Sequence, residues 1–233
     1  MSNGKTAVII VAAGRGIRMN HALPKQYLPL EGKPILAHTL LNLAKIPGVD
    51  SITLVVSEDR IQWCKETIVN KYNIKKVKKV IGGGNTRGES VLNGLGSLDS
   101  QIEIVAIHDG VRPFVEKSIF SHVVEQAKKF GAAICAIPLR DTLKTIDKKN
   151  EVKSTHNRDG LWIVQTPQAF RYSLILEAYE KAMKDGFQAT DDAAIVERLP
   201  HPVKIVEGSL FNIKITTPED LILAEAIWEI GNW

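Results

Sequence analysis

The chain has 233 residues, 44% of them hydrophobic and 24% charged, which suits a single globular domain. No apolar run approaches the ~20 residues that cross a bilayer, so no membrane association is expected. A net charge of +4 favours anionic ligands, but the basic run Lys75–Lys79 lacks interleaved aromatic residues and does not indicate nucleic acid binding. Cys64 and Cys135 lie far apart without a pairing pattern, and the N-terminus does not resemble a secretory signal. We therefore expect a cytoplasmic protein.

Apolar runs typical of buried strands alternate with segments of helical periodicity up to residue 139. The predicted strands cover residues 6–13, 51–57, 79–83, 102–109 and 132–139, and the predicted helices cover residues 34–46, 59–72 and 117–130. Strands that alternate with helices form βαβ units around a mainly parallel sheet. Nearly continuous apolar strands indicate that helices cover both faces of this sheet. The sequence therefore predicts a Rossmann-like, doubly wound α/β fold.

The alternation of strands and helices stops after residue 139. Over residues 140–168 apolar residues alternate around a polar DKKN turn, the pattern of a β-hairpin, and residues 140–160 are its arm. This segment is too short to be a domain, so we expect it to project as an arm from one domain formed by residues 1–233. A helix over 172–186, a strand over 202–208 and a closing helix that Thr217 caps are predicted to follow.

The first strand runs into the glycine-rich segment AAGRGIRM, which ends at Met19. Glycine turns bring backbone N–H groups close to phosphate oxygens, although a tight turn alone would also need glycine. The segment matches neither the P-loop nor the dinucleotide-binding pattern. Two cations, Arg18 and Lys25 of PKQYL, lie nearby in sequence, and Pro24 stiffens the approach. Together these features indicate a polyphosphate site.

Two further motifs follow predicted strands, where ligands bind in such folds. In GGGNTRGESV, Gly84 permits close backbone approach and Asn85 or Ser90 offers hydrogen bonds, unless the segment is a plain loop with a helix cap. In AIHDGVRPF, Asp109 can hold Mg²⁺ or a hydroxyl group and Arg112 an anion, unless the two only pair with each other. His108, beside a buried strand, is interpreted as a core residue and not as a catalytic base.

The combination of cations, glycine loops and one well-placed carboxylate suits phosphoryl or nucleotidyl transfer, in which positioning and charge stabilisation supply most of the catalysis. No grouping of Ser, His and Asp, or of Cys and His, suggests nucleophilic catalysis or a zinc site.

A family resemblance covers the chain from about residue 7 to the final helix. The segments VAAGRGIRM, PKQYL, GGGNTRGESV, HDGVRP, RDTLK, LWIVQTPQAF, TDDA and FNIKITTPEDL occur in this order. Together they resemble the 2-C-methyl-D-erythritol 4-phosphate cytidylyltransferases of the non-mevalonate isoprenoid pathway. Ribitol-5-phosphate cytidylyltransferases are the nearest alternative; their first loop usually reads LAGG where this chain has VAAG. The chain also has Gly110 where the family often has alanine.

The resemblance implies three sets of site residues. The nucleotide-binding set is Ala12, Ala13, Gly14, Gly16, Gly84, Asn85, Ser90 and Asp109. The set around the methylerythritol phosphate is Asp109, Arg112, Thr142, Arg158, Thr166, Thr190 and Lys214. The catalytic cations are Arg18, Lys25, Arg158 and Lys214.

The implied reaction joins CTP to the alcohol phosphate and releases pyrophosphate. Mg²⁺ is expected as the cofactor, held mainly by the CTP phosphates, with Asp109 as a candidate further ligand. The resemblance also implies a homodimer in which Arg112, Thr142 and Arg158 serve the partner's site. Two other functions stay open from sequence: the ribitol phosphate enzyme and a non-catalytic nucleotide-binding module.

Overall fold

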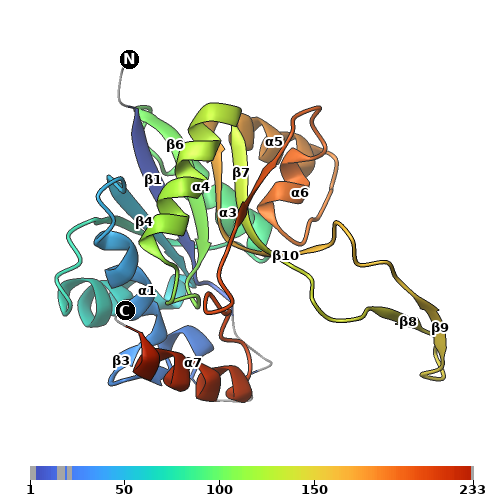
Figure 1. Ribbon diagram of the computed structural model, residues 1–233. Coiled ribbons are helices and arrows are strands. Elements are labelled where there is room, and N and C mark those ends of the chain that lie inside the picture. The colour runs from blue at the N-terminus through green and yellow to red at the C-terminus, as the bar shows by residue number, and fades with distance from the viewer. Residues whose placement is uncertain (1–3, 15–18, 20–22, 232–233) are drawn as a thin grey trace.

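A computed structural model describes residues 4–14, 19 and 23–231, and Figure 1 shows a twisted central sheet with helices on both faces. The seven strands of this sheet are β1 (Lys5–Val11), β4 (Ser51–Val56), β5 (Val77–Gly82), β6 (Ile102–Asp109), β7 (Ala132–Pro138), β10 (Trp162–Arg171) and β11 (Lys204–Glu207). Their order across the sheet is β11-β7-β10-β6-β1-β4-β5. Every neighbouring pair is parallel except the two that involve β10. The predicted α/β class is confirmed.

Helices cover the two faces in two groups. One face carries α1 (Ile35–Ala44), α4 (Lys117–Phe130) and α2 (Ile61–Cys64), which η3 (Glu58–Arg60) precedes and the π-helical turn η4 (Lys65–Asn70) continues. The other face carries α3 (Arg87–Gly96), α5 (Tyr172–Lys184) and α6 (Asp192–Val196). The side chains of β1 alternate between the two cores: Val8 and Ile10 pack in the first and Ile9 in the second. Double coverage explains why this strand is apolar throughout.

Strand β10 differs from the prediction, which assigned its residues to the hairpin. It lies in the main sheet between β6 and β7, antiparallel to both. Its first residues, Trp162–Val164, are exposed, whereas Gln165–Phe170 are buried. The polar segment QTPQ hid this buried strand from pattern analysis. Its pairing with β7 shifts register between Val164 and Gln168, and the intervening residues lie at the site described below.

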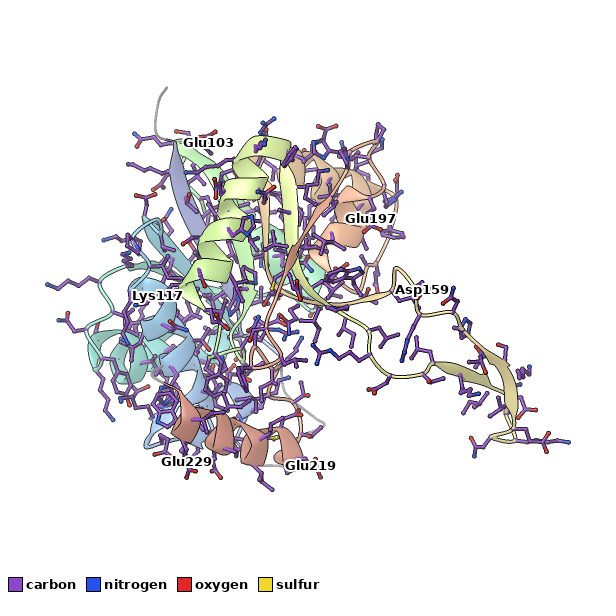
Figure 2. All side chains as sticks on the ribbon, in the orientation of Figure 1. Glu103, Lys117, Asp159, Glu197, Glu219 and Glu229 are labelled. Atoms are coloured by element: carbon purple, nitrogen blue, oxygen red, sulfur yellow. The ribbon has the colours of Figure 1, made fainter. Side chains whose placement is uncertain are left out.

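The predicted arm is present as a two-stranded hairpin, β8 (Lys144–Ile146) and β9 (Val152–Thr155), which projects away from the sheet (Figures 1 and 2). Its DKKN turn is held locally, since a carboxylate oxygen of Asp147 accepts hydrogen bonds from the backbone N–H groups of Lys149 (2.8 Å) and Glu151 (3.0 Å). The hairpin residues are exposed. The arm therefore touches little of its own chain.

A third, smaller core attaches the C-terminal helix α7 (Pro218–Ile230). As predicted, the Thr217 side chain accepts a hydrogen bond from Asp220 N–H in a capping box. Ala224 and Ile227 of α7 pack with Leu28 and Leu30, in a region that the sequence did not predict and that contains the 3₁₀ turn η2 (Lys25–Tyr27), β2 (Pro29–Leu30) and β3 (Lys33–Pro34). The helix thereby brings the segment before it to the carboxyl end of β6. Among the described residues no helix is long and apolar enough to cross a membrane.

Candidate active site

Asp109 ends β6 and lies at the centre of a cluster of three cations. Lys214 Nζ is 2.7 Å from Asp109 Oδ2, Arg112 Nε is 3.8 Å from the same oxygen, and Arg87 Nε is 3.8 Å from Oδ1. Burial opposes the charge of this carboxyl group, but Lys214, Arg87 and Arg112 together hold its pKa well below the usual range. Asp109 is therefore ionised throughout the physiological pH range.

The segment before α7 holds Arg112 and Lys214 in place. Ile215 N–H donates to the carbonyl of Val111 at 3.0 Å, and Arg112 Nη1 donates to the carbonyl of Asn212 at 2.6 Å. Arg112 Nε is buried and has no hydrogen-bond partner among the described residues. The carboxylate of Asp109 lies 3.8 Å from this nitrogen, so Arg112 adds a buried positive charge beside Asp109.

His108 is buried and both of its ring nitrogens are engaged. Its Nε2 donates to the carbonyl of Arg112 at 3.0 Å, since a carbonyl can only accept. Its Nδ1 then accepts from the Thr166 hydroxyl at 3.1 Å, and that hydroxyl accepts from Asp109 N–H at 3.1 Å. Burial lowers the pKa of His108 to about 4, so the ring is neutral. The histidine orients Thr166 beside Asp109, as a core residue would.

A cavity of about 470 Å³ opens at these residues. It brings together five of the predicted substrate residues: Asp109, Arg112, Thr166, Thr190 and Lys214. The remaining lining comes mostly from β10 and α6 and includes Arg87, Gln165, Gln168, Asp191, Ala194 and Glu197. The cavity thus lies beyond the carboxyl ends of the strands, where ligands bind in open α/β sheets.

The glycine loop after β1 is tied to the segment that carries Lys25. The side-chain amide of Gln26 is buried and donates to the carbonyls of Ala12 (2.7 Å) and Gly14 (3.0 Å). Since Lys25 precedes Gln26, its backbone is held near this loop. Gln26 was not singled out from the sequence, although it stands in PKQYL. Arg18 and Gly16 lie outside the described residues.

The loop after β5 packs directly against the first loop. A Cβ atom on Gly83 would lie 2.6 Å from Ala13 Cβ and 2.7 Å from Ser90 Oγ, so only glycine fits there. The Ser90 hydroxyl donates to the carbonyl of Thr86 (2.9 Å) and accepts from Gly84 N–H (3.1 Å). Ser90 therefore shapes the loop that was predicted to hold the cytidine.

Asn85 and Thr86 complete the end of this loop. Asn85 N–H donates to Glu89 Oε2 at 2.7 Å, and Thr86 caps α3 by accepting from Glu89 N–H at 3.1 Å. The loop after β5 is thus both a glycine-rich surface and the capped start of a helix.

Comparison with known proteins identifies the family. The sequence model of the 2-C-methyl-D-erythritol 4-phosphate cytidylyltransferases (IspD) matches residues 6–229. The chain belongs to this family. The enzymes of that name from Desulforamulus reducens and Syntrophus aciditrophicus are both 47% identical to it, over 98% and 95% of both chains.

Solved structures of cytidylyltransferases agree with this assignment. The 4-diphosphocytidyl-2C-methyl-D-erythritol synthase from Anaerococcus prevotii superposes with a TM-score of 0.84 at 37% identity, covering 97% of each chain. The Thermus thermophilus 2-C-methyl-D-erythritol 4-phosphate cytidylyltransferase superposes with a TM-score of 0.80 at 32% identity, covering 97% of this chain and 99% of that one. The fold and the family are thus supported together.

Within the cytidylyltransferase chain, Thr142 and Arg158 do not join the cavity. Both are exposed on the arm, and the guanidinium group of Arg158 donates to the carbonyl of Arg140 at the base of the arm. Arg112 needs a correction, because the resemblance implied that it serves the partner's site. Instead it is buried in the cavity of its own chain, beside Asp109 and Lys214. Its position next to the strand end, and not on the arm, explains this difference.

The cavity can supply few metal ligands. Among the described residues no group of three or more His, Cys, Asp or Glu side chains could hold a metal ion. Asp109 provides one carboxylate, and cations surround it. Such a donor set fits Mg²⁺, which one or two carboxylates and the substrate phosphates usually hold. The residues are therefore compatible with a metal that enters with the triphosphate.

Sequence reasoning missed a second ion pair at the cavity. Arg87 forms two hydrogen bonds with the carboxylate of Asp192, at 2.8 and 2.7 Å. Gln168 of β10 accepts from Asp192 N–H (3.1 Å) and donates to Asp191 Oδ2 (2.9 Å). Both residues stand in segments that the sequence analysis quoted, Arg87 in GGGNTRGESV and Asp192 in TDDA. Nothing near either residue in the sequence indicates that the two form a pair.

Proposed function

We propose that this chain condenses CTP with 2-C-methyl-D-erythritol 4-phosphate to give 4-CDP-2-C-methyl-D-erythritol and pyrophosphate. The observation that supports it most is the cavity at the end of β6, where Lys214, Arg112 and Arg87 surround Asp109 and where Arg87 begins the helix that follows the second glycine loop. Both substrates are polyanions, and this arrangement offers fixed cations to them. The relatives of this chain carry the name of the same reaction.

The nucleophile needs no general base. A phosphomonoester has a second pKa of ~6, so the methylerythritol phosphate is already mostly dianionic at neutral pH. One of its oxygens attacks the α-phosphorus of CTP in line while pyrophosphate leaves. The cations Lys214 and Arg112 hold the attacking phosphate, and Asp109 and Thr190 receive the hydroxyl groups of the alcohol. His108 is consistent with this scheme because it is buried and both of its ring nitrogens are already hydrogen-bonded, so it is not placed to take a proton from the substrate.

Charge that develops on the leaving pyrophosphate needs stabilisation from the opposite side. In this proposal Lys25 provides it together with backbone N–H groups of the loop that begins at Ala12, and Arg18, which lies outside the described residues, is the second cation. Donors that are fixed before the reaction stabilise the transition state without reorganisation. Asp109 would hold Mg²⁺ together with the triphosphate, and the bound ion would act as a Lewis acid that neutralises phosphate charge.

The arm completes the site of a second subunit in this proposal. Exposed apolar side chains occur along it and at its base, among them Leu143, Ile146, Val152, Leu161 and Ile163. A homodimer would cover them and bring Arg158 and Thr142 to the neighbour's alcohol phosphate. Both cysteines are buried free thiols, in keeping with a cytoplasmic enzyme.

The decisive experiment measures pyrophosphate release from each of the four nucleoside triphosphates combined with methylerythritol phosphate or ribitol 5-phosphate. Turnover is expected only with CTP and methylerythritol phosphate, and it should stop when EDTA removes divalent cations. Preference for ribitol 5-phosphate would reassign the substrate. Binding of CTP without pyrophosphate release would instead indicate a non-catalytic nucleotide-binding module.

A further inference from the structure

Arg87 occupies a position that links three parts of the cavity. It is the first residue of α3, directly after the loop proposed to hold the cytidine. Its two terminal nitrogens reach across to Asp192, the first residue of α6, while its Nε lies 3.8 Å from Asp109 Oδ1. A single guanidinium group therefore connects the nucleotide loop, α6 and the central carboxylate.

Asp192, the partner of Arg87, is itself held by several hydrogen bonds. Asp192 is fully buried, and Tyr179 of α5 donates a hydrogen bond to its Oδ1 at 2.5 Å. Its backbone N–H donates to Gln168 Oε1, which also accepts from Ala193 N–H at 2.9 Å. A planar guanidinium group in two parallel hydrogen bonds with such a carboxylate has a defined orientation, which a lysine would not reproduce.

The orientation of Arg87 matters because it faces the side of Asp109 opposite to Lys214. Lys214 and Arg112 approach Asp109 Oδ2, whereas Arg87 approaches Oδ1. At 3.8 Å Arg87 contributes charge and restricts the carboxylate without a direct hydrogen bond to it. Oδ1 can then receive a substrate hydroxyl or metal in a fixed place.

We propose that Arg87 is a positioning residue of this enzyme, held by Asp192 and Tyr179, and that it aligns Asp109 and the start of α3 for the transfer step. The inference rests on the proposed function, and it adds to the charge of Arg87 in the cavity a role in alignment that Arg87 shares with Asp192 and Tyr179. It predicts that these three side chains act as one unit, so that breaking either end of the Arg87–Asp192 pair has the same consequence.

The test compares Arg87→Lys, Asp192→Asn and the double variant in steady-state assays of the reaction that the wild type catalyses. Rates are normalised to the folded fraction of each protein. We expect kcat to fall about 10- to 100-fold in each single variant, because small misplacement of reacting groups is costly, and KM for CTP to change less than threefold. The double variant should be no slower than the slower single variant. Asp185→Asn is the matched control, since it breaks a surface pair of 2.6 Å with Arg198 and should leave kcat unchanged.

Folded single variants with kcat within twofold of wild type, or losses that multiply in the double variant, would overturn the proposal. If the buried-pair variants do not fold, Tyr179→Phe provides the answer, because it removes only one donor to Asp192. Its kcat should fall about three- to tenfold, while its melting temperature stays within a few degrees of that of the wild type. Full activity of this variant would contradict the proposal. Activity of the wild type with CTP is established first, so failure of the proposed function is recognised separately.

Discussion

The cavity and the arm differ in where their polar groups find partners. In the cavity, Asp109 meets Arg87 and Lys214, which are distant from it in sequence, together with Arg112, which follows it by three residues. On the arm, hydrogen bonds are local, as between Lys144 Nζ and Thr155 Oγ1 at 2.6 Å, and Ile146 and Val152 stay exposed. Part of the site is thus already assembled within one chain, whereas the arm is a hairpin without a core. Two-stranded hairpins of this kind are marginal alone, so the arm depends on a further surface.

The sharpest test of this comparison uses two variants, one altered in the cavity region and one altered on the arm, and mixes their subunits. Lys25→Ala and Arg158→Ala should each reduce turnover ~10²–10³-fold, because each removes a charge at a phosphate group. If the arm serves the neighbour's site, a mixed dimer has one site with both lesions and one intact site. Random pairing makes about half of the dimers mixed, so co-expressed variants should regain about a quarter of wild-type activity.

Tag capture verifies that subunits have exchanged. Mixed dimers that stay as inactive as either parent would place Arg158 in the site of its own chain, and the arm would then have no catalytic role across subunits.

Substituting one carboxylate in the cavity and one on the arm compares the importance of the two regions for catalysis. Asp109→Asn should reduce kcat/KM about 100-fold, because it removes the counter-charge of three cations and a substrate ligand. Asp141→Asn, on the exposed start of the arm, should change it less than twofold. Steady-state kinetics at saturating Mg²⁺ measure both. Equal losses would mean that the strand end is not the centre of the reaction.

The exposed apolar residues of the arm predict a change in assembly without a change in folding. Ile146, 53% exposed in a single chain, should tolerate aspartate without loss of the monomer fold. Burying that charge in a dimer is unfavourable, so the dimer dissociation constant of Ile146→Asp should rise about 10- to 100-fold. Sedimentation equilibrium measures it, with Lys148→Asp as a control that also adds an acidic group. Identical dimer strength in wild type and Ile146→Asp would show that the arm docks elsewhere or not at all.

The smallest expected effect is a decrease in folding stability at acidic pH that arises from the buried His108. Because burial lowers the pKa of His108 from 6.5 to about 4, the unfolded state binds more protons than the folded state between these values. Stability should therefore be complete above pH 6.5 and decrease as the pH falls, by about 1 kcal/mol between pH 6.5 and 5.5 from this residue. Urea unfolding of wild type and His108→Gln measures the difference in slope. Equal slopes in wild type and His108→Gln would contradict the prediction.

Much of this molecule could be predicted from local pattern. Apolar strands, helix periodicity and the Thr217 cap depend on near neighbours in sequence, and the structure confirms them. Strand β10 was missed because the buried residues Gln165 and Gln168 satisfy their amides through partners far away in sequence, Ser209 and Asp191. The pairing of Arg87 with Asp192, 105 positions apart, is likewise a property of the fold and not of either motif. The orientation of Arg112 likewise depends on a distant partner, the carbonyl of Asn212, to which its guanidinium group donates.

The arm connects two strands that are already neighbours. β7 and β10 pair with each other, and Leu139 N–H donates to the carbonyl of Leu161 at 3.0 Å where the arm leaves the sheet. Closing a longer loop over such a base costs only ~0.6 kcal/mol for each doubling of its length. Insertions, deletions and exchanges between lineages in residues 140–160 should consequently leave the sheet intact. Evolution can then change the length and sequence of the arm while the cavity beside β6 stays the same.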